Sequence, residues 1–106
     1  MVARRSKRIR VNIKADMIKG HEHHASFIEN LSEGGVLVTA PAKDSIEFSP
    51  DTPIELEFQF HDGNKHHLHC RVRWSHITPP HGLTKSIGME IISAPEYFRE
   101  ALRTLQ

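Results

Sequence analysis

The chain has 106 residues, of which 38% are hydrophobic and 25% are charged, and this composition predicts one soluble folded domain over residues 1–106. No apolar run approaches the ~18 residues that a membrane-spanning helix needs, and no apolar stretch follows the basic residues at the start, so neither membrane insertion nor a standard secretion signal is expected. Cys70 is the single cysteine, which excludes an internal disulfide and agrees with a cytoplasmic location.

Positive charge is concentrated at the start of the chain. The net charge is +1, but residues 1–14 hold six basic side chains and no acid, which leaves a net charge of −5 on the remainder. The six are Arg4, Arg5, Lys7, Arg8, Arg10 and Lys14. Such a segment attracts phosphate groups of nucleic acid, lipid or nucleotide, although a solvated, disordered tail has the same composition.

Alternating hydrophobicity predicts three strands in the first half of the chain. From Ile9 to Met17, apolar and polar side chains alternate strictly, as in a half-buried strand. Residues 22–29 form a weaker strand and residues 36–39 a short third one. Residues 30–35 between them are dense in turn formers, and residues 41–52 are expected to form a loop.

The fourth and fifth strands have the clearest alternation. Their apolar positions are Ile54, Leu56, Phe58 and Phe60 before the turn signal Asp62-Gly63, and Leu68, Cys70, Val72 and Trp74 after it. A three-residue loop at 62–64 keeps these positions on one face. It would place Leu56 opposite Cys70 and give Asn64 the left-handed conformation that such loops need.

The end of the chain changes from strand to helical spacing. Residues 75–85 are expected to form a loop and residues 86–92 a sixth strand. Ser93 to Glu96 matches a capping box, and Phe98, Ala101, Leu102 and Leu105 then recur at helical spacing. The predicted fold is therefore mainly β: a small six-stranded antiparallel β-barrel over residues 9–92 with a C-terminal helix over 93–106. A flexible basic N-terminal arm over residues 1–8, called the basic arm below, precedes the barrel.

Two short motifs flank the predicted strands. Arg4-Arg5-Ser6-Lys7-Arg8 has the form R-x-x-x-R, and Asn30-Leu31-Ser32-Glu33-Gly34-Gly35 has the form N-x-S-x-x-G. Each alone is weak evidence, because basic tails are common and Asn, Ser and Gly are ordinary turn residues. Together, in this order around a barrel pattern, they resemble the PilZ domain family over nearly the whole chain. In that family the two signatures jointly bind cyclic di-GMP.

The resemblance implies a binding site for cyclic di-GMP, a bacterial second messenger with two phosphodiesters and two guanines. It makes Arg4 and Arg8 the principal ligands and Arg5 a helper. A guanidinium suits this role because its planar fork pairs with phosphate oxygens or with O6 and N7 of guanine.

The resemblance also assigns roles on the turn. It implies that Asn30 contacts a guanine edge and that Ser32 contacts guanine or phosphate. Gly35 has no side chain, so the backbone there can approach the ligand closely. Glu33, inside the motif, is expected to point to solvent.

Trp74 admits two interpretations. Its parity continues the inward face of the fifth strand, which predicts a core residue. Its position also resembles one where some PilZ domains place an aromatic side chain beside the nucleotide, which predicts contact with the ligand.

Histidines form two clusters, His21-Glu22-His23-His24 and His66-His67-Leu68-His69. On a strand His67 and His69 point the same way, so a surface zinc or nickel site is geometrically possible. Paired cysteines and a helical His-Glu-x-x-His are absent from the sequence, so adventitious binding is favoured and no metal site is assigned. Cys70 is expected to be a small core residue and not a nucleophile.

We therefore expect a receptor without enzymatic activity and without a cofactor beyond its ligand. Cyclic di-GMP would change the conformation of the basic arm, and the altered surface would engage a downstream protein. Two alternatives remain: a small barrel that binds nucleic acid through its arm, and a PilZ-like interaction module that binds no nucleotide.

Overall fold

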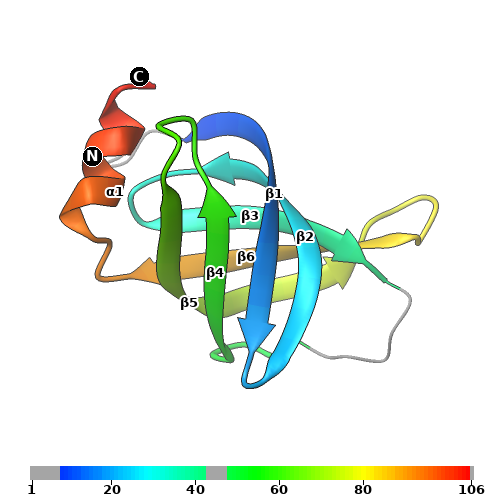
Figure 1. Cartoon of the computed structure of the whole chain (residues 1–106). Helices are drawn as coiled ribbons and strands as arrows, with labels where there is room; N and C mark the ends of the chain where they lie inside the picture. The colour runs from blue at the N-terminus through cyan, green and yellow to red at the C-terminus, as the bar shows by residue number, and fades with distance from the viewer. Residues whose placement is uncertain (1–7, 43–47, 106) are drawn as a thin grey trace, which may run out of the picture.

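The strands of the chain close into a barrel. The computed structural model describes residues 8–42 and 48–105. Six strands are followed by one helix: β1 (Ile9–Lys19), β2 (Glu22–Leu31), β3 (Gly35–Pro41), β4 (Pro53–Gln59), β5 (Lys65–Ile77), β6 (Thr84–Ile92) and α1 (Glu96–Arg103). Around the barrel the order is β1-β2-β3-β6-β5-β4, and every neighbouring pair is antiparallel (Figure 1). The predicted six-stranded barrel with a C-terminal helix is confirmed.

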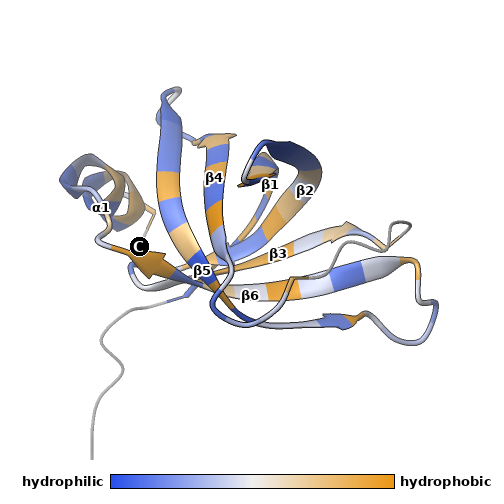
Figure 2. Cartoon of the chain, turned by 90° about the horizontal axis from the view of Figure 1, so that it is seen from below, coloured by the Kyte–Doolittle hydropathy of each residue, from blue (hydrophilic) through white to orange (hydrophobic). Residues whose placement is uncertain are grey.

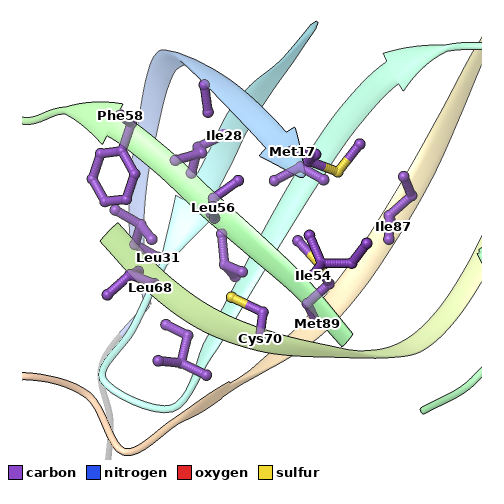
Figure 3. Packing of buried hydrophobic residues seen from close by; sticks show 14 of the residues in the cluster. Met17, Ile28, Leu31, Ile54, Leu56, Phe58, Leu68, Cys70, Ile87 and Met89 are labelled. Atoms are coloured by element: carbon purple, nitrogen blue, oxygen red, sulfur yellow. The ribbon is translucent and has the colours of Figure 1, made fainter. Parts of the chain in front are cut away.

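Alternation along the strands builds the core. Figure 2 shows β4 and β5 as bands of alternating hydropathy, because successive side chains point to opposite faces of a strand. The inward side chains of β4 and β5 pack with those of the other strands in the barrel interior (Figure 3). The side chains that Figure 3 labels are Met17, Ile28, Leu31, Ile54, Leu56, Phe58, Leu68, Cys70, Ile87 and Met89. Cys70 is buried, as predicted.

The helix α1 packs on the barrel through one apolar face. Phe98, Ala101 and Leu102 are buried, and the Phe98 ring lies 6.1 Å from the ring of Phe60. His61 Nε2 lies 2.9 Å from the carbonyl oxygen of Ala101, which adds a polar contact at the same junction. No helical segment among the described residues has the length and apolar character required to cross a bilayer.

The predicted pairing of β4 with β5 is wrong by two residues. Leu56 lies opposite Leu68, and Ile54 lies opposite Cys70. The loop does have three residues, but it comprises residues 61–63, because the Phe60 amide donates to the Asn64 carbonyl at 3.0 Å. Gly63, at a φ of +82°, takes the left-handed conformation that had been assigned to Asn64. Glycine adopts that conformation without steric cost, which explains the preference.

The predicted capping box at the start of α1 is also wrong. The helix begins after Pro95, and no side-chain hydrogen bond caps it. Ser93 lies two residues before that position with a φ of +51°, so it is not the N-cap residue. Glu96 instead accepts a hydrogen bond from Arg99 at 2.7 Å.

His66 is buried. This burial was not predicted, because His66 belongs to a polar cluster of histidines in the sequence. It has the same parity as Leu68 and therefore points inward. Its ring stacks against Tyr97 of α1 at 4.7 Å and against Phe58 at 5.7 Å. The carboxylate of Asp62, 3.1 Å from Nε2, supplies one polar partner. His66 thus belongs to the junction between the barrel and α1.

Candidate ligand-binding site

The turn between β2 and β3 is held by the Ser32 hydroxyl. Ser32 is buried, and its Oγ accepts hydrogen bonds from the Gly35 amide at 3.0 Å and the Gly34 amide at 3.3 Å. The Ser32 amide in turn donates to the Gly35 carbonyl at 2.8 Å. The carbonyl of Gly34 accepts from the Ile91 amide at 3.0 Å, which ties the turn to β6. The N-x-S-x-x-G motif therefore forms a turn that is held by its own hydrogen bonds and by one to β6.

Arg8 joins the two sequence motifs. It directly precedes β1, and its guanidinium donates a hydrogen bond to the side-chain oxygen of Asn30 on β2. A Cβ atom at Gly35 would lie 3.3 Å from Arg8 Nη2, so a larger residue there would crowd the guanidinium. The last arginine of R-x-x-x-R and the first and last residues of N-x-S-x-x-G thus lie together.

Trp74 lies on the outside of the barrel, so the prediction that it continues the inward face is wrong. It is 43% exposed. A bulge in β5 causes the change: Val72 pairs with Met89 and Trp74 with the next residue, Gly88, so Arg73 is an extra residue. The bulge reverses the parity of β5 beyond Val72. The outward Trp74 ring stacks on the His76 ring, with centroids 5.0 Å apart.

A groove with a volume of about 310 Å³ connects these features. It is lined by Arg8, Asn30, Val36, Leu37, Arg73, Trp74, Gly88 and Met89. Arg8 and Arg73 supply positive charge, and the indole of Trp74 supplies a flat apolar surface. Such a combination suits an anionic ligand that carries planar rings.

Five lining residues were not predicted to belong to the site: Val36, Leu37, Arg73, Gly88 and Met89. One sequence signal for this wall was available, since a glycine inside a strand often marks a close approach of another group. Here the approaching group is Trp74, which lies against Gly88. Arg73 also forms an ion pair with Glu90 at 3.2 Å.

The structure brings together some of the predicted site residues. Arg8, Asn30 and Trp74 line the groove, whereas Ser32 and Gly35 form the turn beside it. Arg4 and Arg5 lie outside the described residues. Glu33 is exposed, as predicted, and its carboxylate lies 3.8 Å from Arg99 Nε of α1.

A family model described as PilZ domain matches residues 3–105. The chain belongs to the PilZ domain family. The match includes both motifs, the six strands and the helix, so the family resemblance seen in the sequence is confirmed. No curated protein matches the chain.

Solved structures with this PilZ fold include three that align over nearly the whole chain. The inhibitor of motility MotI/DgrA of Bacillus subtilis has a TM-score of 0.79 at 17% identity. The alignment covers 96% of this chain and 48% of the MotI/DgrA chain. The K. pneumonia MrkH–c-di-GMP complex has a TM-score of 0.75 at 13% identity, covering 98% and 51%. The PilZ domain of YcgR from Escherichia coli, solved with c-di-GMP, has a TM-score of 0.70 at 13% identity, covering 96% and 88%. This PilZ chain thus spans about half the length of the first two structures.

Proposed function

We propose that this chain is a receptor for cyclic di-GMP, acting as one ligand-binding unit and without enzymatic activity. The observation that carries the proposal is the contact between Arg8 and Asn30, which unites the two PilZ signatures beside an exposed tryptophan. The cyclic di-GMP complexes of the structural neighbours MrkH and YcgR support the same ligand.

The arginines would bind the charged and hydrogen-bonding groups of the ligand. Arg8 already lies at the groove, and Arg4 and Arg5 belong to the same motif. Each guanidinium can pair two donors with phosphate oxygens or with O6 and N7 of guanine. Arg73 faces the same groove and would add a further positive charge.

The turn between β2 and β3 would bind the ligand mainly through the side chain of Asn30 and through the backbone of the turn. The Asn30 amide can exchange its bond with Arg8 for a guanine edge, and Gly35 leaves room for the arginine and the nucleotide together. We propose that Ser32 acts chiefly by holding the amides of Gly34 and Gly35. A direct bond from its hydroxyl to guanine or phosphate would require these contacts to rearrange.

Trp74 would stack on a guanine of the bound nucleotide. Its indole is exposed at the groove wall and lies against Gly88, and the His76 ring stacks on it, so a guanine would either share the exposed part of the indole or displace the His76 ring. Stacking of a base on an aromatic side chain contributes roughly 1–3 kcal/mol. This assignment replaces the core interpretation that strand parity favoured.

The basic arm would be the element that changes on binding. Beyond Met1, residues 1–8 hold only one apolar side chain larger than alanine, Val2, so burial alone cannot fold them. Ordering about five residues costs roughly 1–2 kcal/mol each, which contacts with the ligand must exceed. The arm would then close over the nucleotide and present a new surface to a downstream protein in the cytoplasm.

Isothermal titration calorimetry tests the proposal. Cyclic di-GMP should bind, and GTP and a generic oligonucleotide should bind far more weakly. Arg8→Ala should lower the affinity roughly ten- to a hundredfold, because a lost charge-assisted hydrogen bond costs about 1.5–3 kcal/mol.

Lys14→Ala is the matched control for that variant. It removes the same charge from an exposed side chain of β1 that does not line the groove, so its affinity should stay close to wild type. Equal binding by wild type and Arg8→Ala, or a tighter complex with the oligonucleotide than with cyclic di-GMP, would contradict the proposal.

A further inference from the structure

The outer face of β4 and β5 carries a cluster of metal-binding side chains away from the groove. In the register, Glu57 lies opposite His67 and Glu55 lies opposite His69. Alternation directs these four side chains to the outside of the barrel. One ligand atom each from Glu55, His67 and His69 lies within 4.8 Å of the other two. None of the three lines the groove described above.

His67 is held in a defined orientation by carboxylates. Its Nδ1 lies 2.9 Å from Glu57 Oε2, and its Nε2 contacts Glu55 Oε1. The His67 and His69 rings are 5.3 Å apart. A carboxylate bonded to one nitrogen of an imidazole fixes its tautomer and directs the other nitrogen toward a metal. Glu57 therefore leaves His67 Nε2 facing Glu55, with the His69 ring beside the His67 ring.

We propose that Glu55, His67 and His69 form a surface site for a divalent transition metal ion of the zinc class. Two imidazole nitrogens and one carboxylate oxygen would bind the ion, and water would complete its coordination. Glu57 would accept the hydrogen bond from His67 Nδ1. The sequence alone favoured no metal site, because paired cysteines and a helical His-Glu-x-x-His are absent from it.

The geometry requires only side-chain adjustment. Zinc bonds of about 2.0–2.2 Å to nitrogen and oxygen place tetrahedral ligand atoms roughly 3.5 Å apart, so atoms within 4.8 Å must approach slightly. Glu55 and His69 are exposed and His67 is partly exposed, so their side chains can rotate while the strand pairing stays fixed. The metal would replace the contact between His67 Nε2 and Glu55 that the structure contains.

The donor set selects the class of ion. Imidazole suits zinc, copper, nickel and iron, whereas magnesium and calcium prefer sites made of oxygen alone. The pair His23 and Asp16, which lie 2.6 Å apart on neighbouring strands, offers only one imidazole and one carboxylate. The same barrel therefore holds a second histidine–carboxylate group that has fewer donor atoms than the proposed site.

Zinc titration of the full chain by calorimetry tests the site. We expect one zinc ion per chain at a low micromolar dissociation constant, without cyclic di-GMP present. His69→Ala and Glu55→Gln should each weaken binding about tenfold or more, since even the loss of an outer-shell partner has effects of this size. His21→Ala is the matched control, because His21 is exposed and belongs to no cluster of three donors among the described residues.

Several results would overturn the metal site. These are equal zinc affinity in wild type and His69→Ala, equal weakening by His21→Ala, binding of magnesium as tight as that of zinc, or binding of zinc only at millimolar concentration. Cyclic di-GMP titration of His69→Ala distinguishes this proposal from the receptor function. Unchanged nucleotide affinity with lost zinc binding supports a separate site.

Discussion

The indole of Trp74 lies across the backbone of Gly88 so closely that a Cβ atom at position 88 would lie 2.6 Å from Trp74 Cζ2. That separation is shorter than any van der Waals contact, so the tryptophan can occupy its place only because residue 88 is glycine. Trp74 is also the single tryptophan of the chain, so its fluorescence reports on this wall of the groove alone.

Gly88→Ala should displace the Trp74 ring without unfolding the barrel, because the ring is at the surface and can rotate away. The emission maximum should move to longer wavelength as the indole becomes more exposed. If a guanine stacks on Trp74, affinity for cyclic di-GMP should fall about tenfold, which corresponds to roughly 1.4 kcal/mol of lost stacking. Fluorescence and calorimetry measure the two effects.

Gly34→Ala is the control for that substitution, because a Cβ there meets nothing within 4 Å. Its emission should match that of wild type. An unchanged spectrum in Gly88→Ala would mean that the ring does not lie against residue 88. A displaced ring with unchanged affinity would remove Trp74 from the ligand site.

Cyclic di-GMP should protect the basic arm from trypsin. Trypsin cleaves after Arg4, Arg5, Lys7 and Arg8, which the proposed complex would hold against the nucleotide. Mass spectrometry of a digestion time course should show these cuts slowed far more than cleavage after Arg103. GTP should give no such protection. Equally fast cleavage of the arm at saturating cyclic di-GMP would mean that the barrel alone holds the ligand.

Ser32→Ala should lower the free energy of unfolding by about 1–3 kcal/mol, because the buried Gly35 amide would lose its hydrogen bond to Ser32 Oγ. Urea unfolding followed by circular dichroism measures the change. Ser49→Ala, at an exposed serine, should leave the unfolding free energy within about 0.5 kcal/mol of wild type. Wild-type stability in Ser32→Ala would show that the hydroxyl does not hold the turn.

The pKa of His23 should lie above its ordinary value of 6.5, because its ring is hydrogen bonded to the negative charge of Asp16. The pair should therefore contribute stability below about pH 6.5 and lose it as the pH rises through the higher folded-state pKa. NMR titration of the ring protons checks the shift. Asp16→Asn should return the pKa toward 6.5, whereas Glu22→Gln should have little effect. An unchanged pKa in Asp16→Asn would contradict this cause.

Burial raises the pKa of the Cys70 thiol to about 12, so the native protein should resist thiol reagents near neutral pH. Iodoacetamide at about pH 8 should label Cys70 rapidly in denaturant and very slowly without it. Mass spectrometry reads out both reactions. Rapid labelling of the folded chain would place the thiol at the surface.

Much of this fold was predictable because strand alternation is a local property. Leu56, Leu68 and Cys70 point into the barrel as their parity required, and all six predicted strands are present. The motif residues Arg8 and Asn30 could be named in advance because both belong to short motifs that resemble the PilZ signatures. Guanidinium and amide groups have a chemistry that does not depend on their exact position.

What the tertiary structure decided is how distant segments meet. One extra residue, Arg73, reverses the parity of β5 and moves Trp74 from the core to the groove. A loop placed one residue earlier brings His67 opposite Glu57 and thereby forms the proposed metal site. The positions of bulges and the register of strands depend on the summed pairing energy of whole strands. The hydrogen bond of Phe60 and the conformation of Gly63 are only two of the many contributions to that sum. The local pattern of hydrophobicity cannot distinguish two registers that differ by two residues, because such a shift leaves every side chain on the same face.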